Sequence, residues 1–200
     1  MIRLAVLDDH PAVLSGLQRL AERAPDLQPV AFVETEDALR RALDQRPADV
    51  VIVDYDLARG EGLAVCQRLK QRSPSPGVVV YSAYAGSALA VAARAAGADG
   101  LVGKSDPVPD LLASVRRVAE GDSLLPAIQR DAQHAAMSRL DEDDLAIGSM
   151  LLVSATHEMI AETLDVGQDE VEWRARRIVA RMRPTGAPFT RRSGRDTGAR

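Results

Sequence analysis

The chain has 200 residues, of which 46% are hydrophobic, and a formal net charge of −4. This length suits one core of ordinary size plus a second, smaller domain. No apolar run approaches the roughly 20 residues that span a bilayer, so we expect a cytoplasmic protein with no membrane segment. Cys66 is the only cysteine, which excludes an intrachain disulfide and a cysteine-based zinc site.

Residues 1–121 alternate short apolar runs with amphipathic stretches five times, which is typical of βα units around a parallel sheet. The predicted strands are Ile2–Leu7, Pro29–Val33, Val50–Val53, Val78–Tyr81 and Gly100–Val102. The predicted helices are Pro11–Glu22, Glu36–Gln45, Gly62–Gln71, Ser87–Ala96 and Pro109–Glu120. We therefore expect an α/β fold with a five-stranded, doubly wound parallel sheet of the flavodoxin-like kind.

The alternation stops after residue 121, and residues 122–139 are interpreted as a linker or connecting helix. A second, small domain of helices only is predicted over residues 140–183. Its helical patterns are Glu142–Val153, His157–Leu164 and Gln168–Met182. Residues 184–200 are rich in Arg, Gly, Pro and Thr, which predicts a disordered basic tail.

Charge is distributed unevenly over the C-terminal third of the chain. Residues 131–172 hold eleven acids and one base, whereas residues 173–200 hold nine arginines and one acid. Such asymmetry indicates either an electrostatic contact surface or a disordered arginine-rich tail.

Acidic side chains follow two of the predicted strands. Asp8 and Asp9 end the first strand, and Asp54 ends the third. Because ligands of an open α/β sheet bind at the carboxyl ends of its strands, we expect the three carboxylates to meet there. Like charges crowded in this way need a cation, and oxygen ligands suit Mg²⁺.

Two further polar residues complete a phosphoryl site. Ser82 ends the fourth strand, where its hydroxyl can donate to a phosphoryl oxygen, and Lys104 follows the fifth, where its ammonium can neutralise another. A carboxylate held on Mg²⁺ beside these groups can attack phosphorus and give an aspartyl phosphate. His10 is interpreted as opening the first helix rather than as a metal ligand.

In the order and spacing of these residues, residues 1–121 resemble the receiver domain of two-component response regulators. The resemblance implies that Asp54 accepts a phosphoryl group from a histidine kinase. It also implies that Mg²⁺ is held by Asp8, Asp9, Asp54 and the backbone carbonyl of Asp56. Gly62 stands where the family places glycine, whereas Leu101 replaces the aromatic residue that moves inward after phosphorylation in this family.

The last predicted helix has one apolar stripe, formed by Val171, Ala175, Ile178 and Met182 at spacings of four, three and four residues. Its arginines project elsewhere. Residues 140–183 resemble the LuxR-type helix-turn-helix of NarL/FixJ response regulators, through Met159-Ile160-Ala161, Leu164–Val166, Val171 and Ile178–Met182. This implies binding to double-stranded DNA in the major groove, with a homodimer as the active form. The candidate contacts are Trp173, Arg174, Arg176, Arg177 and Arg181.

The leading hypothesis is a transcription regulator, not an enzyme, in which phosphorylation of Asp54 alters DNA binding. The acidic block Asp141–Asp144 motivates an alternative, a phosphorylation-switched protein-interaction module with a degenerate helix-turn-helix. Leu101 motivates a third hypothesis, a constitutive DNA-binding protein whose receiver no longer switches.

Overall fold

The computed structural model of the chain describes residues 1–57 and 61–184. Its strands are β1 (Ile2–Leu7), β2 (Leu27–Val33), β3 (Val50–Asp54), β4 (Gly77–Ser82) and β5 (Gly100–Gly103). They form one parallel sheet in the order β2-β1-β3-β4-β5. The predicted five-stranded, doubly wound sheet is confirmed, and each strand agrees with its predicted range to within two residues.

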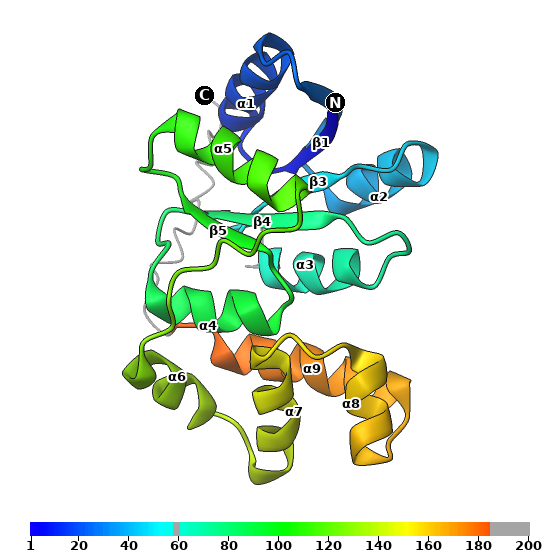
Figure 1. Cartoon of the computed structure of the whole chain (residues 1–200), viewed down its shortest axis with the longest axis vertical. Helices are drawn as coiled ribbons and strands as arrows, with labels where there is room; N and C mark the ends of the chain where they lie inside the picture. The colour runs from blue at the N-terminus through cyan, green and yellow to red at the C-terminus, as the bar shows by residue number, and fades with distance from the viewer. Residues whose placement is uncertain (58–60, 185–200) are drawn as a thin grey trace, which may run out of the picture.

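Helices cover both faces of the sheet (Figure 1). They are α1 (Pro11–Arg23), α2 (Glu36–Gln45), α3 (Gly62–Lys70), α4 (Ser87–Ala95) and α5 (Val108–Ala119). Successive side chains of a strand point to opposite faces. Val50 and Ile52 of β3 therefore pack with α1 and α5, while Val51 and Val53 pack with α2, α3 and α4.

The C-terminal part of the chain folds into four helices among the described residues: α6 (Arg130–Met137), α7 (Glu142–Leu152), α8 (His157–Leu164) and α9 (Gln168–Met182). The segment predicted as a linker or connecting helix thus contains α6, which packs against α4. The predicted tail lies outside the described residues, apart from Pro184. No described helix has both the length and the apolar composition needed to cross a membrane.

A tight turn joins α8 to α9. Thr156 caps the start of α8 by accepting a hydrogen bond from the Met159 N–H, at 3.2 Å. At the other end, Asp165 adopts the left-handed conformation (φ 56°) that ends a helix. Gly167 then precedes α9. The predicted helix–turn–helix geometry is therefore present.

Helix α9 packs against α3 and α4 of the N-terminal sheet domain (Figure 1). Its predicted apolar stripe is buried, and Val179 joins it. These side chains belong to the same apolar cluster as the α3 and α4 residues that cover the sheet. The two parts of the chain consequently share one continuous core.

Buried Asp144 joins α7 to α9 by ion pairs. One of its oxygens accepts from Arg174 Nε at 3.0 Å, and the other accepts from Arg177 Nη2 at 2.7 Å. The Asp144 side chain is fully buried, so its charge depends on these two guanidinium groups. The acidic opening of α7 thereby holds α9 in place.

We expect Asp144→Ala to lower the free energy of unfolding by about 3 kcal/mol, because two partly buried arginines lose their counter-ion. Urea unfolding of the full chain measures this. The matched control is Asp143→Ala, since Asp143 is the exposed neighbour on the same turn; its effect should stay below about 1 kcal/mol. Equal effects of the two changes would contradict a structural role for the buried ion pairs.

Candidate phosphoryl site

The site lies where β1 and β3 end side by side. Leu7 of β1 is in register with Val53 of β3, so the residues that follow them come together at one edge of the sheet. Asp8 and Asp54 are each only 1% exposed, while Asp9 is partly exposed. The predicted meeting of the three carboxylates is thus observed in the geometry.

Lys104 reaches into this acidic edge from the end of β5. Its Nζ lies 2.9 Å from Asp8 Oδ2 and 2.9 Å from Asp54 Oδ1. Burial lowers the pKa of Lys104, but its hydrogen bonds to Asp8 and Asp54 outweigh burial and raise that pKa overall. The lysine is therefore held as a cation against both buried carboxylates.

One lysine does not compensate all the negative charge. Asp54 Oδ1 accepts from Lys104 and from the Asp56 N–H, at 3.1 Å. Asp54 Oδ2 and Asp9 Oδ1 are buried without a hydrogen-bond partner. Burial, and then the charge of Asp8, raise the pKa of Asp54. Unpartnered carboxylate oxygens and a raised carboxyl pKa show that these residues fit a cation-binding site.

His10 is part of this site, which the sequence interpretation missed. It is the N-cap residue of α1, as expected, but its side chain makes no capping hydrogen bond. Instead, its Nδ1 lies 3.0 Å from Asp8 Oδ1 and 2.9 Å from Asp9 Oδ1. Asp8, Asp9, His10 and Asp54 each offer a ligand atom within 4.8 Å of the others.

Ser82 and Asp56 flank the carboxylates. Ser82 is fully buried at the end of β4, one residue beyond the Tyr81 that pairs with Asp54. Its Oγ accepts the Tyr84 N–H at 3.1 Å, which leaves the hydroxyl proton to be donated. Asp56 is exposed, but its carboxyl group is partly desolvated. This desolvation raises the pKa of Asp56 overall, although the charges of Lys104 and Arg183 lower it.

Gly62 at the start of α3 touches the backbone of the site. A Cβ at this position would lie 2.3 Å from the Asp54 carbonyl oxygen and 2.8 Å from Tyr55 Cα. Backbone atoms cannot move aside as a flexible side chain can. The glycine therefore allows α3 to approach the end of β3 directly below the carboxylates.

Gly62→Ala should lower the free energy of unfolding by about 2 kcal/mol, because the added methyl group overpacks the junction of β3 and α3. It should also slow phosphoryl uptake at Asp54. Thermal unfolding and labelling from acetyl phosphate measure the two effects. Gly16→Ala is the control: its Cβ meets no atom within 4 Å, so we expect a gain of up to about 1 kcal/mol from helix propensity. A stable Gly62→Ala protein would refute the tight approach.

The candidate DNA-contacting residues all lie on α9 and take part in local pairs. Trp173 is exposed, with the Arg177 guanidinium 4.5 Å from its ring centroid. Arg176 pairs with Glu172, and Arg181 pairs with Asp141. Arg174 and Arg177 turn toward the buried Asp144, as described above.

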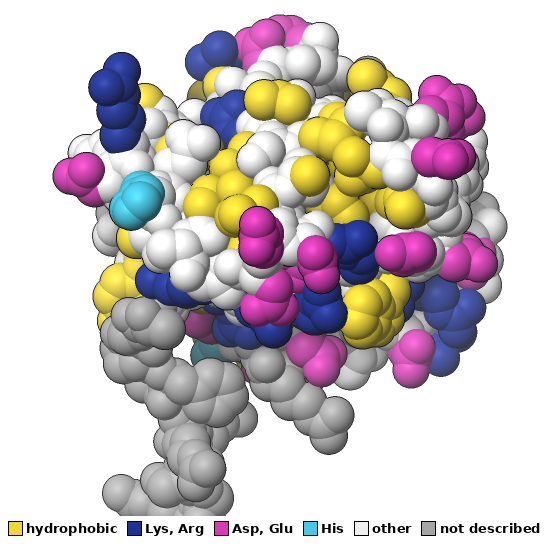
Figure 2. Space-filling view, turned by 90° about the horizontal axis from the view of Figure 1, so that it is seen from below, with side chains coloured by type: hydrophobic (Ala, Val, Ile, Leu, Met, Phe, Trp, Pro, Cys, Tyr) yellow, Lys and Arg dark blue, Asp and Glu magenta, His cyan; other side chains and the backbone are white. Residues whose placement is uncertain are grey.

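The face of the C-terminal helices is mixed in charge. Figure 2 shows acidic side chains beside the basic ones, around an apolar patch. The large exposed apolar residues of these helices are Leu145, Met159 and Trp173. The arginines predicted to contact DNA therefore do not form a purely basic stripe on this face.

Leu101 and Cys66 are both buried in the cluster that α9 shares with the sheet domain. Leu101 lies on β5, paired in register with Val80. Burial raises the pKa of the Cys66 thiol, so Cys66 acts as an inert packing residue.

Comparison with known proteins identifies the class. The sequence profile of the response regulator receiver domain matches residues 4–116, more than half of the chain. The chain therefore belongs to the response regulator receiver family.

Similar proteins extend the likeness beyond the receiver. The nitrate/nitrite response regulator protein NarL of Escherichia coli K12 is 23% identical over 191 residues, covering 90% of this chain and 88% of NarL. The DNA-binding transcriptional activator DevR/DosR of Mycobacterium tuberculosis is 27% identical over 193 residues, covering 91% and 88%. The predicted membership among NarL/FixJ-type response regulators is confirmed.

A solved structure shows the same fold. RcsB from Salmonella enterica serovar Typhimurium, bound to the rprA promoter in the presence of the phosphomimetic BeF3⁻, superposes with a TM-score of 0.57. The two are 21% identical, and the match covers 92% of this chain and 94% of RcsB. The receiver and these relatives support a phosphorylation-controlled regulator of transcription.

Proposed function

We propose that Asp54 accepts a phosphoryl group from a histidine kinase and that this event controls DNA binding by helices α7–α9. The observation that carries the proposal is the buried Asp54 carboxylate. One of its oxygens is held by Lys104 and the other has no hydrogen-bond partner, beside two further aspartates at the end of the sheet.

The residues divide the chemistry among them. Asp8, Asp9, Asp54 and the backbone carbonyl of Asp56 would hold Mg²⁺, which would supply positive charge to the phosphoryl oxygens. An Asp54 oxygen attacks phosphorus, a P–O bond forms, and the bond from phosphorus to the histidine nitrogen of the kinase breaks. The kinase keeps the electron pair of that bond on its imidazole.

Two further side chains then contact the oxygens of the phosphoryl group on Asp54. Lys104, already 2.9 Å from Asp54 Oδ1, supplies a positive charge to one phosphoryl oxygen. Ser82 donates its hydroxyl proton to another, because its Oγ already accepts the Tyr84 N–H. Ser82 ends β4 and Lys104 follows β5, so phosphorylation changes the ends of these two strands.

Arg183, the residue that follows α9, contacts Tyr55, which is the neighbour of the phosphoacceptor in the sequence. The Arg183 guanidinium is 5.5 Å from the ring centroid of Tyr55, and its Nε is 3.4 Å from the Tyr55 hydroxyl oxygen. Tyr55 directly follows Asp54 and is buried. We propose that phosphorylation disturbs this contact and loosens α9 from α3 and α4, which frees the helix-turn-helix to bind double-stranded DNA as a homodimer.

The ion pairs of the arginines indicate which of the candidate residues can contact DNA at the lowest cost in free energy. Arg174 and Arg177 neutralise a buried aspartate, so using them on phosphate would leave that charge unpaired. Arg176 and Arg181 pair with partly exposed or exposed acids and can exchange them for phosphates at lower cost. Trp173 is exposed beside them. We infer that Arg176, Arg181 and Trp173 make the main contacts.

Asp54→Asn should abolish phosphoryl uptake from acetyl phosphate in the presence of Mg²⁺, because an amide is not a nucleophile toward phosphorus. Phosphate-affinity electrophoresis of the full chain measures the uptake. Asp56→Asn is the control, since Asp56 contributes its backbone carbonyl and should keep most of the labelling. Unchanged labelling of Asp54→Asn would overturn the assignment of the phosphoacceptor.

Arg176→Ala and Arg181→Ala should each weaken DNA binding by the phosphorylated full chain and lower the slope of log affinity against log salt by about one. Fluorescence anisotropy on genomic fragments enriched by the unaltered chain measures both. Arg40→Ala, an exposed arginine on α2, is the control and should change neither.

The acids that pair with the arginines of α9 favour a second candidate, a phosphorylation-switched protein-interaction module. That candidate predicts no selective enrichment of any genomic fragment, even with the phosphorylated chain. A constitutive DNA-binding protein predicts equal affinity with and without phosphorylation.

A further inference from the structure

The imidazole of His10 is the group at the acidic edge that the proposed phosphoryl chemistry does not use. Pro11 follows it as the first residue of α1, and His10 itself has extended backbone angles (φ −106°, ψ 105°). Its N–H donates to Asp8 Oδ1 at 2.8 Å, which fixes the residue against the carboxylates. Because its side chain does not cap α1, the ring is free to turn toward the pocket.

The ring nitrogen points at the two unpartnered oxygens. Nδ1 lies 2.9 Å from Asp9 Oδ1 and 3.8 Å from Asp54 Oδ2, the same atoms that are buried without a hydrogen-bond partner. It also lies 3.0 Å from Asp8 Oδ1, with hydrogen-bond geometry. An imidazole nitrogen carries one hydrogen or one lone pair, so a single hydrogen bond cannot satisfy all of these oxygens.

A metal ion can satisfy them together. Metal bonds of about 2.1 Å in octahedral geometry place neighbouring ligand atoms about 3.0 Å apart and opposite ones about 4.2 Å apart. The separation of 2.9 Å from Nδ1 to Asp9 Oδ1 matches neighbouring ligands, and the 3.8 Å to Asp54 Oδ2 lies between the two values. Asp54, which supplies one of these oxygens, is only 1% exposed.

We propose that His10 Nδ1 is a metal ligand in this pocket, together with Asp9 and Asp54. The inference rests on the proposed function, because it places the ion where the phosphoryl site needs one. An imidazole suits first-row transition metals, whereas Mg²⁺ prefers oxygen ligands. His10 therefore shifts the preference of the site from Mg²⁺ toward later first-row ions such as Co²⁺.

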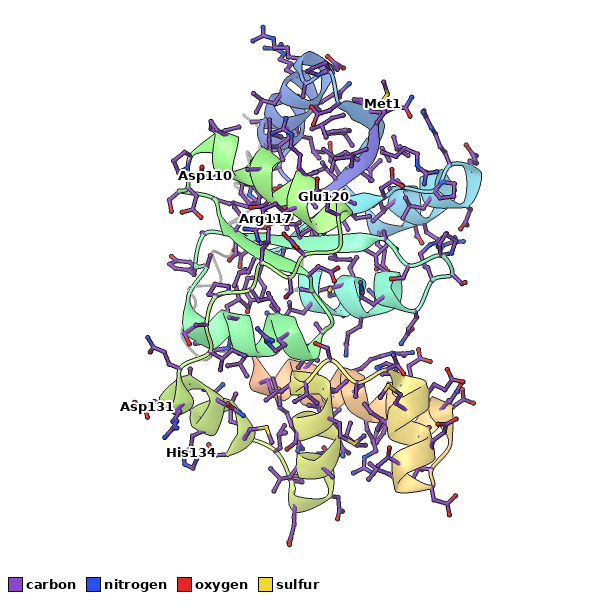
Figure 3. All side chains as sticks on the ribbon, viewed as in Figure 1. Met1, Asp110, Arg117, Glu120, Asp131 and His134 are labelled. Carbon is purple, nitrogen blue, oxygen red and sulfur yellow. The ribbon has the colours of Figure 1, made fainter. Side chains whose placement is uncertain are left out.

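The other two histidines provide contrast. His134 is exposed and projects from α6 at the opposite end of the chain's fold from α1 (Figure 3). His157 at the start of α8 lies 3.5 Å from Gln71 Nε2, and burial lowers its pKa. Neither belongs to the group of potential ligands that contains His10.

The test is the identity of the atoms bound to Mn²⁺ in the full chain at about pH 8, where a free imidazole is neutral. Electron spin-echo envelope modulation detects a directly coordinated imidazole nitrogen. We expect this ¹⁴N signal in the unaltered chain and in the control His134→Ala, and its loss in His10→Ala and His10→Gln. The glutamine variant keeps a hydrogen-bond donor beside Asp8. If His10 acted only through hydrogen bonding, this variant would therefore keep its affinity for the metal.

Calorimetric titration with Co²⁺ and with Mg²⁺ gives the second readout. His10→Gln should weaken Co²⁺ binding about tenfold and change Mg²⁺ binding less than about threefold. Mn²⁺ bound without an imidazole ¹⁴N signal would overturn the role of His10 and leave the acidic site standing. Failure of all three ions to bind the unaltered chain would instead refute the metal site of the proposed function, and the His10 inference with it.

Discussion

Burial of the Asp54 carboxylate is the constraint on which the rest of the structure depends. A charged group that is 1% exposed, beside the equally buried Asp8, is unfavourable unless cations accompany it. Lys104 supplies one positive charge from the end of β5, and two carboxylate oxygens remain without a hydrogen-bond partner. The parallel sheet brings these groups to one edge, so the fold itself gathers an excess of negative charge that a metal ion can neutralise.

The second determinant is the shared apolar core of the sheet domain and α9. Burial of apolar surface does not distinguish one domain from another, and without α9 the apolar residues on the outer surfaces of α3 and α4 would be exposed. Because α9 occupies that side and its end reaches Tyr55, a change beside Asp54 has a short route to the helix-turn-helix. Buried Asp144 meanwhile keeps α7 and α9 together, so the C-terminal helices can move as a unit.

The sequence predicted the elements well because their periodicities are strong. The strand ranges agreed to within two residues, and the strand-end placement of Asp8, Asp54, Ser82 and Lys104 followed from the order of βα units. The apolar stripe of α9 was likewise predicted from its spacing. The features that could not be predicted from the sequence depend on tertiary contacts. The arginines of α9 meet acids about 30 residues away on α7, and a charge tally shows only that both exist.

His10 was missed for a related reason. A histidine before Pro11 fits the start of a helix, and the structure confirms that position. The direction of its ring depends on the carboxylates of Asp8, Asp9 and Asp54. The local sequence does not show that Asp54 lies close to His10. Its position directly after Asp9 was the available signal. The docking of α9 on α3 and α4 had no signal at all, since an apolar stripe does not name the surface it covers.

Hydrogen–deuterium exchange of the full chain, with and without Mg²⁺ and beryllofluoride, tests most directly whether the state of Asp54 controls α9. We expect slower exchange in the loops after β1, β3 and β5, together with faster exchange in α9 and on the facing surfaces of α3 and α4. Slower exchange at the acidic edge with no change in α9 would show that the site binds its ligand without releasing the helix-turn-helix, and would contradict the proposed control.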